Sequence, residues 1–282
     1  MNHRRLPYRL LALDADGTIL TADQQVRPAV RAAIRAAQER GVIVVLATGR
    51  AFRGAQAIAR SVGLTAPVIC YQGAVVQDPT SEEVLLSETY PRTLIYELLD
   101  WTEPRRLDVT VYVDGSIYLK ELRHPPEFYD RWFGLPMRLV PDLRAGLPGD
   151  PTKFLLIAES ETCDRILPEL QTLFAGRLEV FRSHDLFVEG TAPGVSKGSA
   201  LAYLAARYGI PQEQVIAVGD AGNDLEMLRW AGLGVAMGNA APEVQAVADW
   251  VAPSIMDDGV AEVIRRFILS PSPDGHADVA RG

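Results

Sequence analysis

The sequence predicts an α/β protein in which a parallel-sheet domain is interrupted by an inserted α+β module. Short apolar runs rich in β-branched residues alternate with helical patterns in the first and last thirds of the chain. Strands that are apolar along their whole length are typical of a parallel sheet covered by helices on both faces. The middle third instead contains strand pairs joined by tight turns, which favour antiparallel pairing.

The first third predicts three buried strands and two helices. Strands are expected at residues 8–13, 42–47 and 66–70, and helices at residues 28–40 and 51–62. Pro28 stands at the start of the first helix and Gly41 follows its end, which are the positions that these residue types favour. Gly73 separates the third strand from a short apolar run.

The last third repeats this alternation. Helices are expected at residues 196–208, 224–230, 242–248 and 259–269, and strands at residues 214–218, 233–237 and 250–252. Residues 271–282 are rich in proline, glycine and serine, so we expect a disordered tail there.

The middle of the chain predicts two similar units, each a helix followed by two strands. The helices are expected at residues 91–101 and 163–174, and Asp114-Gly115 is a strong turn pattern between the first two strands. Residues 124–158 lie between the units and are expected to add a helix and one or two strands. The expected division is therefore residues 1–85 and 190–270 for the parallel-sheet domain, with residues 86–189 as the inserted module.

Composition excludes several classes of protein. The chain has 28 basic and 36 acidic residues in 282, a net charge of −8, which disfavours nucleic acid or an anionic membrane as partner. The longest apolar run, residues 42–47, is far shorter than the ~18 residues of a membrane span. Cys70 and Cys163 stand too far apart in sequence to suggest a metal site or a disulfide framework. We expect a soluble, cytoplasmic protein.

The first polar motif, DADGT, directly follows the first strand. Asp14 and Asp16 offer a nucleophile and an acid or base, and Gly17 lets the backbone turn sharply. The alternative is an ordinary turn, because aspartate and glycine are common turn residues.

Two further motifs open helices. In ATGR, the Thr48 hydroxyl and the Gly49 N–H stand at a helix start, where anions are favoured, although a simple N-cap threonine is the alternative. In GVSKG, Lys197 is a compact cation suited to a phosphate or a carboxylate. A solvated lysine in a first helical turn is the alternative.

The fourth motif, GDAGNDLEML, follows the strand at residues 214–218. Asp220 and Asp224 offer hard oxygen ligands and Asn223 offers an amide, although an acidic first turn that complements the helix dipole is the alternative. Because ligands of open parallel sheets bind beyond the carboxyl ends of the strands, we expect Asp14, Thr48 and Asp220 to meet there. Carboxylates gathered in this way need a cation, and oxygen ligands near phosphate favour Mg²⁺.

In this order, the four motifs resemble those of the haloacid dehalogenase superfamily, and most closely its Cof-type phosphatase branch. The resemblance covers nearly the whole chain, including GLGVAMGN at residues 232–239 and Asp258-Gly259-Val260. It implies a Rossmann-like parallel-sheet core with an inserted α+β cap. The long interval between Thr48 and Lys197 leaves room for that cap, and the paired units suggest the C2B type.

The resemblance also implies a Mg²⁺-dependent phosphatase for a small phosphate monoester, such as a sugar phosphate. Asp14 would form an aspartyl-phosphate, and Asp16 would act as acid and then as base. The implied metal ligands are Asp14, Asp16 through its backbone carbonyl, Asp220 and Asp224, and the implied phosphate contacts are Thr48, Gly49, Lys197 and Asn223. A phosphotransferase or mutase acting on sugar phosphates, and a non-catalytic phospho-ligand binding protein, are the alternatives.

Substrate choice is expected to lie in the cap, because the core supplies only the chemistry of the phosphate. Arg182, Ser183 and His184 of the second hairpin are the candidate contacts, although a solvated strand end is the alternative. On the core, Arg50 and Gln72 are candidates; Gln72 stands where relatives often have asparagine, which lengthens the reach of the amide. The expected partner is a small phosphorylated metabolite. The sequence does not determine the oligomeric state.

Overall fold

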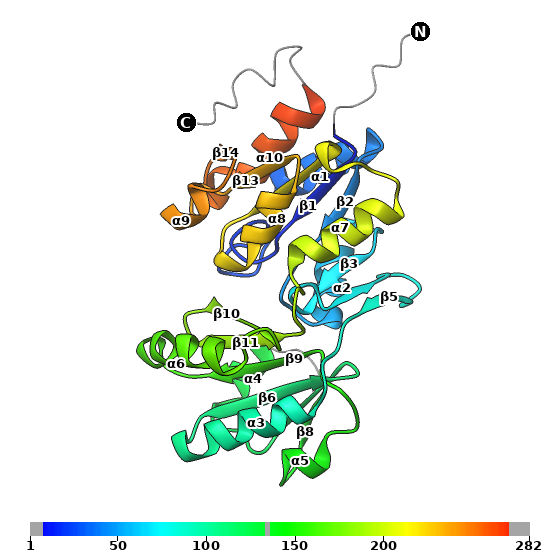
Figure 1. Cartoon of the computed structure of the whole chain (residues 1–282). Coiled ribbons are helices and arrows are strands. Elements are labelled where there is room, and N and C mark those ends of the chain that lie inside the picture. Colours follow the sequence, from blue (N-terminus) through cyan, green and yellow to red (C-terminus); the bar gives the residue numbers. More distant parts are fainter. Residues whose placement is uncertain (1–7, 133–135, 271–282) are drawn as a thin grey trace.

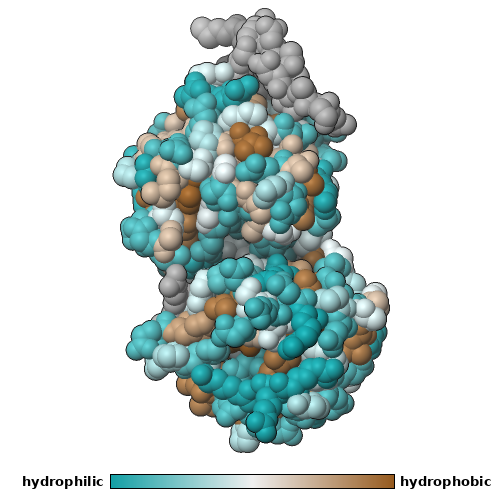
Figure 2. All heavy atoms as spheres, turned by 90° about the vertical axis from the view of Figure 1, so that its left-hand side faces the viewer, coloured by the Kyte–Doolittle hydropathy of each residue, from teal (hydrophilic) through white to brown (hydrophobic). Residues whose placement is uncertain are grey.

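The computed structural model describes residues 8–132 and 136–270, which form two bodies stacked one above the other (Figure 1). The predicted disordered tail, residues 271–282, lies outside the described residues. A space-filling view shows two lobes separated by a waist, with polar residues covering most of that face (Figure 2). Among the described helices, none combines the length and apolar character needed to cross a membrane.

The first body is built on a five-stranded sheet in which every neighbouring pair is parallel. Its strand order is β14-β13-β12-β1-β2, with bounds Trp250–Val251, Leu233–Ala236, Val215–Gly219, Leu10–Leu13 and Ile43–Leu46. All residues of β1, β12 and β13 are buried, as their apolar composition predicts. The predicted parallel sheet is confirmed.

Helices cover both faces of this sheet. They are α1 (Pro28–Glu39), α2 (Phe52–Val62), α7 (Lys197–Arg207), α8 (Leu225–Trp230), α9 (Pro242–Gln245) and α10 (Gly259–Ile264), which continues as a π-helical turn over Arg265–Leu269. Leu11 and Leu13 of β1 belong to the same apolar cluster as α1 and α10. Leu10 and Ala12 belong to the cluster of α7 and α8. Because side chains alternate along a strand, β1 contributes to two cores.

The third predicted strand departs from this pattern. It forms β3 (Val68–Cys70), which pairs antiparallel with β4 (Val75–Gln77), and β4 pairs with β5 (Val84–Ser87). Only an isolated bridge between Ala47 and Ile69 continues the parallel order. The backbone of Tyr71, Gln72 and Gly73 has positive φ angles, so the chain reverses there and β3 pairs with the strand that follows it.

The second body is a six-stranded sheet in the order β10-β11-β9-β6-β7-β8, antiparallel except for β7 and β8. The strands are β6 (Asp108–Val113), β7 (Ser116–Leu119), β8 (Met137–Leu139), β9 (Lys153–Ile157), β10 (Glu179–His184) and β11 (Phe187–Thr191). The helices are α3 (Thr93–Thr102), α4 (Pro126–Trp132), α5 (Leu143–Gly146) and α6 (Ser160–Leu173).

The two predicted helix–strand–strand units are α3-β6-β7 and α6-β10-β11. Asp114 and Gly115 have φ angles of 46° and 70°, the left-handed values that a tight hairpin turn requires. The segment at 124–158 adds two helices and two strands, one helix more than expected.

The chain passes between the bodies just after β5 and just after β11. The N–H of Glu88 donates to Ala74 of the first body, and the N–H of Tyr90 donates to Pro151 of the second. The boundaries expected at 85/86 and 189/190 fall inside β5 and β11, which stay paired within their own sheets. We therefore refer to residues 8–87 and 192–270 as the core, and to the described part of residues 88–191 as the cap.

Candidate active site

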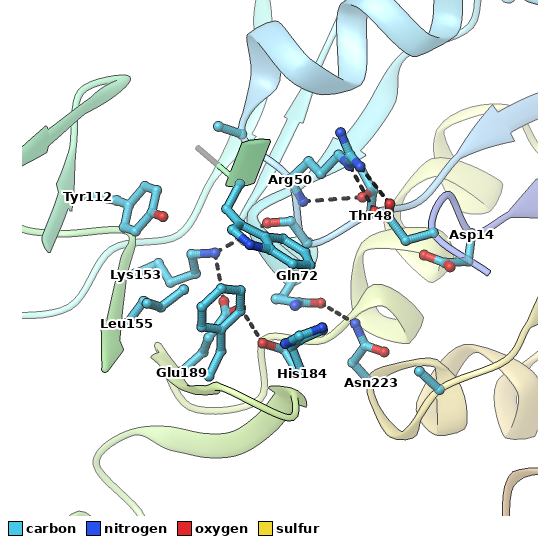
Figure 3. Close-up of a pocket in the computed structure, with 17 residues that line it drawn as sticks. Asp14, Thr48, Arg50, Gln72, Tyr112, Lys153, Leu155, His184, Glu189 and Asn223 are labelled. Carbon is cyan, nitrogen blue, oxygen red and sulfur yellow. Dashed lines mark hydrogen bonds and ion pairs between the residues drawn. The ribbon is translucent and has the colours of Figure 1, made fainter. Parts of the chain in front are cut away.

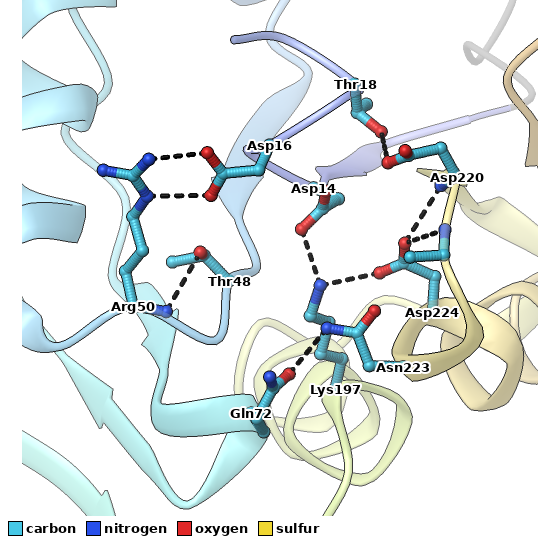
Figure 4. Close-up of polar contacts among 11 residues, drawn as sticks. Asp14, Asp16, Thr18, Thr48, Arg50, Gln72, Lys197, Asp220, Asn223 and Asp224 are labelled. Carbon is cyan, nitrogen blue, oxygen red and sulfur yellow. Dashed lines mark hydrogen bonds and ion pairs between the residues drawn. The ribbon is translucent and has the colours of Figure 1, made fainter. Parts of the chain in front are cut away.

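The carboxyl ends of three core strands bring the sequence motifs together (Figure 4). Asp14 follows β1, Thr48 comes two residues after the end of β2, and Asp220 follows β12. These strands are neighbours and parallel, so their ends share one edge of the sheet. Asp14 and Thr48 are both buried there, at 5% and 1% exposure.

Lys197 lies at the centre of this group. Its Nζ is 2.6 Å from Asp14 Oδ1 and 2.7 Å from Asp224 Oδ1, and its side chain is 1% exposed. Ser196 caps the helix start through a reciprocal bond with Ser199, which fixes Lys197 as the first residue of α7. Burial alone would lower the pKa of Lys197, but the two carboxylates hold that pKa above its ordinary value. This burial excludes the solvated alternative.

Asp220 and Asp224 are held by the loop that carries them. Thr18 Oγ1 donates to Asp220 Oδ1 at 3.0 Å, and Asp224 Oδ2 accepts the backbone N–H groups of Asp220 and Ala221 at 3.0 Å. The Asp220 carboxylate also packs directly on Gly17, whose φ is +85°, so a larger residue there would overlap it. The first and fourth motifs therefore fit together tightly.

The acidic cluster carries more negative than positive charge. One carboxylate oxygen each from Asp14, Asp220 and Asp224 lie within 4.8 Å of one another. Burial, with repulsion from Asp224, raises the pKa of Asp14 well above its ordinary range and that of Asp220 to about 6. Lys197 supplies a single positive charge against three carboxylates. Hard oxygen donors with uncompensated charge fit a small divalent cation.

Asp16 points away from this cluster toward Arg50 (Figure 4). Arg50 Nε lies 2.8 Å from Asp16 Oδ2 and Arg50 Nη2 lies 2.5 Å from Asp16 Oδ1, which makes a bidentate pair. The Gln24 amide bonds to both partners, because its N–H donates to Asp16 and its oxygen accepts from Arg50. Burial acts to raise the pKa of Asp16, but the Arg50 hydrogen bonds and charge lower it below its ordinary value. Asp16 is therefore held by Arg50, and this pairing favours its ionised form.

The amide of Gln72 reaches the fourth motif. Asn223 Nδ2 donates to Gln72 Oε1 at 2.9 Å, and Gln72 has a left-handed φ of 61°. Asn223 Oδ1 is buried without a hydrogen-bond partner among the described residues, so its capacity to accept a hydrogen bond is unused there. Beside them, Gly49 packs directly on the Gln72 side chain.

A cavity of about 120 Å³ lies between this edge of the core and the cap (Figure 3). From the core it is lined by Asp14, Asp16, Thr48, Gly49, Arg50, Ala51, Gln72, Ala221 and Asn223. From the cap it is lined by Tyr112, Trp132, Lys153, Leu155, Ser183, His184, Phe187 and Glu189. Lys197, Asp220 and Asp224 lie beneath its floor, in contact with Asp14 or with its neighbours.

Two of the three predicted substrate contacts of the cap lie at the cavity, and the third lies away from it. Ser183 and His184 line the cavity, as expected. Arg182 is not among the lining residues, because its guanidinium bonds to Asp164 and Ser160 of α6 and to the loop after β10. The pairing of β10 with β11 shifts register between Arg182 and His184, and at this irregularity Ser183 and His184 both reach the cavity while Arg182 bonds to α6.

Several residues that line the cavity are not predicted from the sequence. Lys153 and Glu189 are charged residues within the otherwise apolar strand patterns KFLLI and FVEGT, which is the feature that could have identified them. Trp132, His184 and Phe187 form an aromatic group with ring centroids 4.6–5.2 Å apart. Aromatic residues in a cap module are also ordinary core residues, so sequence alone does not assign the two not predicted, Trp132 and Phe187, to a pocket.

A family model for haloacid dehalogenase-like hydrolases matches residues 11–264. The chain belongs to that family. The YxeH protein of Bacillus subtilis is 32% identical over 93% of this chain and 99% of its own length. The 5-amino-6-(5-phospho-D-ribitylamino)uracil phosphatase YitU of the same organism is 30% identical over 93% of this chain and 97% of its own.

Solved structures agree with this assignment. A haloacid dehalogenase-like hydrolase from Bacillus subtilis superposes with a TM-score of 0.82 at 28% identity, over 92% of this chain and all of its own. The predicted family, and the predicted α/β core with an inserted cap, are thereby confirmed. The chain is a hydrolase of this superfamily.

Proposed function

We propose that the chain is a Mg²⁺-dependent phosphatase that hydrolyses a small phosphate monoester through an aspartyl-phosphate on Asp14. The observation that carries this proposal is the buried carboxylate of Asp14, held by Lys197 at 2.6 Å and facing the cavity below the cap. The name of the relative YitU, a phosphatase of a phosphorylated metabolite, supports the same class of reaction.

In the first step, an oxygen of Asp14 attacks phosphorus and the bond from phosphorus to the leaving alcohol breaks. Lys197 orients the nucleophile by holding Oδ1. The leaving oxygen takes a proton from Asp16, so the Asp16 carboxyl must first leave Arg50 and become protonated. Acid catalysis of this kind is worth about 10²–10⁴-fold.

In the second step, Asp16 takes a proton from water, the water oxygen attacks phosphorus, and Asp14 is released with inorganic phosphate. Thr48, the Gly49 N–H and Lys197 would donate to the non-bridging oxygens, where negative charge accumulates in the transition state. Asn223 is placed to orient the bound group.

Asp14, Asp220, Asp224 and the backbone carbonyl of Asp16 would hold the metal ion. Their oxygen donors and excess negative charge fit Mg²⁺, as argued above. When bound, Mg²⁺ supplies positive charge to a phosphate oxygen in addition to that of Lys197.

The cavity favours a compact substrate. Its volume of about 120 Å³ lies well below the roughly 300–1,000 Å³ of pockets that bind drug-sized ligands. The cap wall presents the aromatic group of Trp132, His184 and Phe187 to the leaving group, beside Ser183. A phosphorylated sugar or small ring compound satisfies both conditions.

The test is phosphate release from a panel of sugar phosphates, nucleotides and pyridoxal phosphate, with Mg²⁺ or with EDTA. We expect turnover that needs Mg²⁺ and that is fastest with a compact member of the panel. Mass spectrometry of the protein, quenched during turnover, should find phosphate on Asp14. Turnover at an equal rate in EDTA would refute the metal dependence, and transfer of phosphate to an added sugar in preference to water would identify a phosphotransferase.

A further inference from the structure

A buried ion pair lies on the cap wall of the cavity, apart from the acidic cluster. Lys153 Nζ of β9 is 2.6 Å from Glu189 Oε2 of β11, and the two side chains are 4% and 5% exposed. Ser183 Oγ also donates to Glu189, so the carboxylate is fixed within the cap. Both strands are central in the cap sheet, and the pair faces the core (Figure 3).

Lys153 makes three contacts with the surrounding protein. Besides Glu189, its Nζ donates to the carbonyl of Gly49 at 3.2 Å and lies 4.6 Å from the centroid of the Tyr112 ring. An ammonium group has three N–H donors, and the face of a tyrosine ring accepts a cation. These contacts are all with the protein, which favours a role for Lys153 in holding the cavity wall over a role in binding substrate.

The contact with Gly49 crosses from the cap to the core. The carbonyl of Gly49 and the N–H of Arg50 belong to one planar peptide group. That N–H donates to Thr48 Oγ1 at 3.2 Å. Lys153 thus fixes the plane of the peptide whose opposite end orients the Thr48 hydroxyl, one of the proposed phosphate contacts.

Stability alone does not account for this pair. Removing two charges from water costs several kcal/mol each, and apolar residues of similar volume are often as stabilising or more so. The pair is nevertheless formed where the cap contacts the ATGR loop, residues 47–50. A hydrogen-bond donor is needed there because the target is a backbone carbonyl, which an apolar side chain cannot hold.

We propose that Lys153, held by Glu189, is a positioning residue that completes the phosphate-binding loop when the cap rests on the core. This inference depends on the proposed phosphatase function. It means that docking of the cap and orientation of the Thr48 hydroxyl are a single event. The contribution of Lys153 then acts on the phosphoryl group, whatever alcohol leaves.

The test compares kcat/KM for acetyl phosphate and p-nitrophenyl phosphate, whose leaving groups differ in size and shape. Lys153→Met should lower both values by a similar factor, about 10- to 100-fold, as expected when a reacting group is slightly misplaced. Glu189→Gln keeps an acceptor for Lys153 and should lose less. As a matched control, Arg177→Met removes an exposed cap ion pair with Glu97 and should leave both values unchanged.

A double variant separates positioning from folding. Lys153→Met leaves Glu189 buried without its cation and is expected to lower the melting temperature, whereas Lys153→Met with Glu189→Leu replaces the pair by apolar residues of similar volume. The double variant should melt near the wild-type temperature yet remain as inactive as Lys153→Met. Rescue of activity together with stability would overturn the proposal.

Two other outcomes are equally decisive. A loss confined to p-nitrophenyl phosphate would show that Lys153 serves the leaving group, which contradicts a role on the phosphate loop. If the wild-type protein releases phosphate from neither probe in the presence of Mg²⁺, the proposed function itself fails. If instead the wild type is active and the Lys153→Met variant is equally active, the positioning role of Lys153 alone is refuted.

Discussion

Replacing Asp220 by asparagine should make the metal-free protein more stable while removing its activity. Burial, with repulsion from Asp224, raises the pKa of Asp220 from 3.8 to about 6. Each pH unit of pKa difference is worth about 1.4 kcal/mol, so ionised Asp220 costs the folded state about 3 kcal/mol. Solvent reaches part of this side chain, and screening reduces the expected gain to about 1–3 kcal/mol.

The dependence on pH follows from proton binding. Because the pKa of Asp220 is raised by folding, the folded protein binds more protons than the unfolded chain between about pH 4 and pH 6. Wild-type stability in EDTA should therefore increase as the pH falls from 7 through 6. The asparagine variant lacks this group, so its advantage should be full at pH 8 and should shrink below pH 6.

Thermal unfolding in EDTA at several pH values measures this difference. Asparagine has the same shape and keeps an oxygen that can accept from Thr18, so packing is preserved. Added Mg²⁺ should raise the melting temperature of the wild type more than that of the variant. Equal stability of the two proteins in EDTA at pH 8 would refute the argument that uncompensated charge is stored in the cluster.

Three further substitutions test separate parts of the site. Asp14→Asn should abolish turnover and the covalent phosphate seen by mass spectrometry, with an unchanged circular dichroism spectrum; wild-type turnover would exclude Asp14 as nucleophile. Arg50→Met removes the partner that lowers the pKa of Asp16, so the limb of the kcat/KM profile that reports Asp16 should move to higher pH, and an unmoved limb would contradict this. Gly73→Ala places a methyl group on the Ser196 carbonyl at a φ of +105° and should destabilise the protein by about 2 kcal/mol or more in urea unfolding, whereas a neutral effect would show that the turn can relax.

The arrangement of the core site could be predicted because it depends on local features. Each of Asp14, Thr48 and Asp220 comes soon after a run of apolar residues that forms a strand. Once the strands are parallel, their carboxyl ends share an edge, whatever the detailed order of the sheet. Local pattern and sheet direction predict this shared edge, and the adjacency of β12, β1 and β2 in the sheet then brings the three residues together.

The cap side of the cavity depends on features that no local pattern contains. Lys153 and Glu189 meet because β9 and β11 are neighbours in the cap sheet although separate in the chain. Arg182 illustrates the converse, since its position at a hairpin end suggests a substrate contact, but its guanidinium bonds to α6 beside an irregularity in the strand pairing. The expected parallel pairing of the third strand is wrong for a related reason, because the backbone reversal at Gly73 makes this strand pair with the one that follows it.

Two buried lysines lie near the cavity, and their different contacts indicate different roles that the residue type alone does not distinguish. Lys197 has two carboxylate partners among the described residues, which leaves one of its three N–H donors for a phosphate oxygen. Lys153 instead pairs with Glu189, donates to the Gly49 carbonyl and lies over the Tyr112 ring. The first lysine can therefore act on the substrate directly, whereas the second can act only through the loop that it holds. Substituting either should reduce turnover, but the loss of Lys197 should weaken the binding of inorganic phosphate more, because Lys197 retains a donor for that ligand whereas Lys153 acts through the loop that carries Thr48.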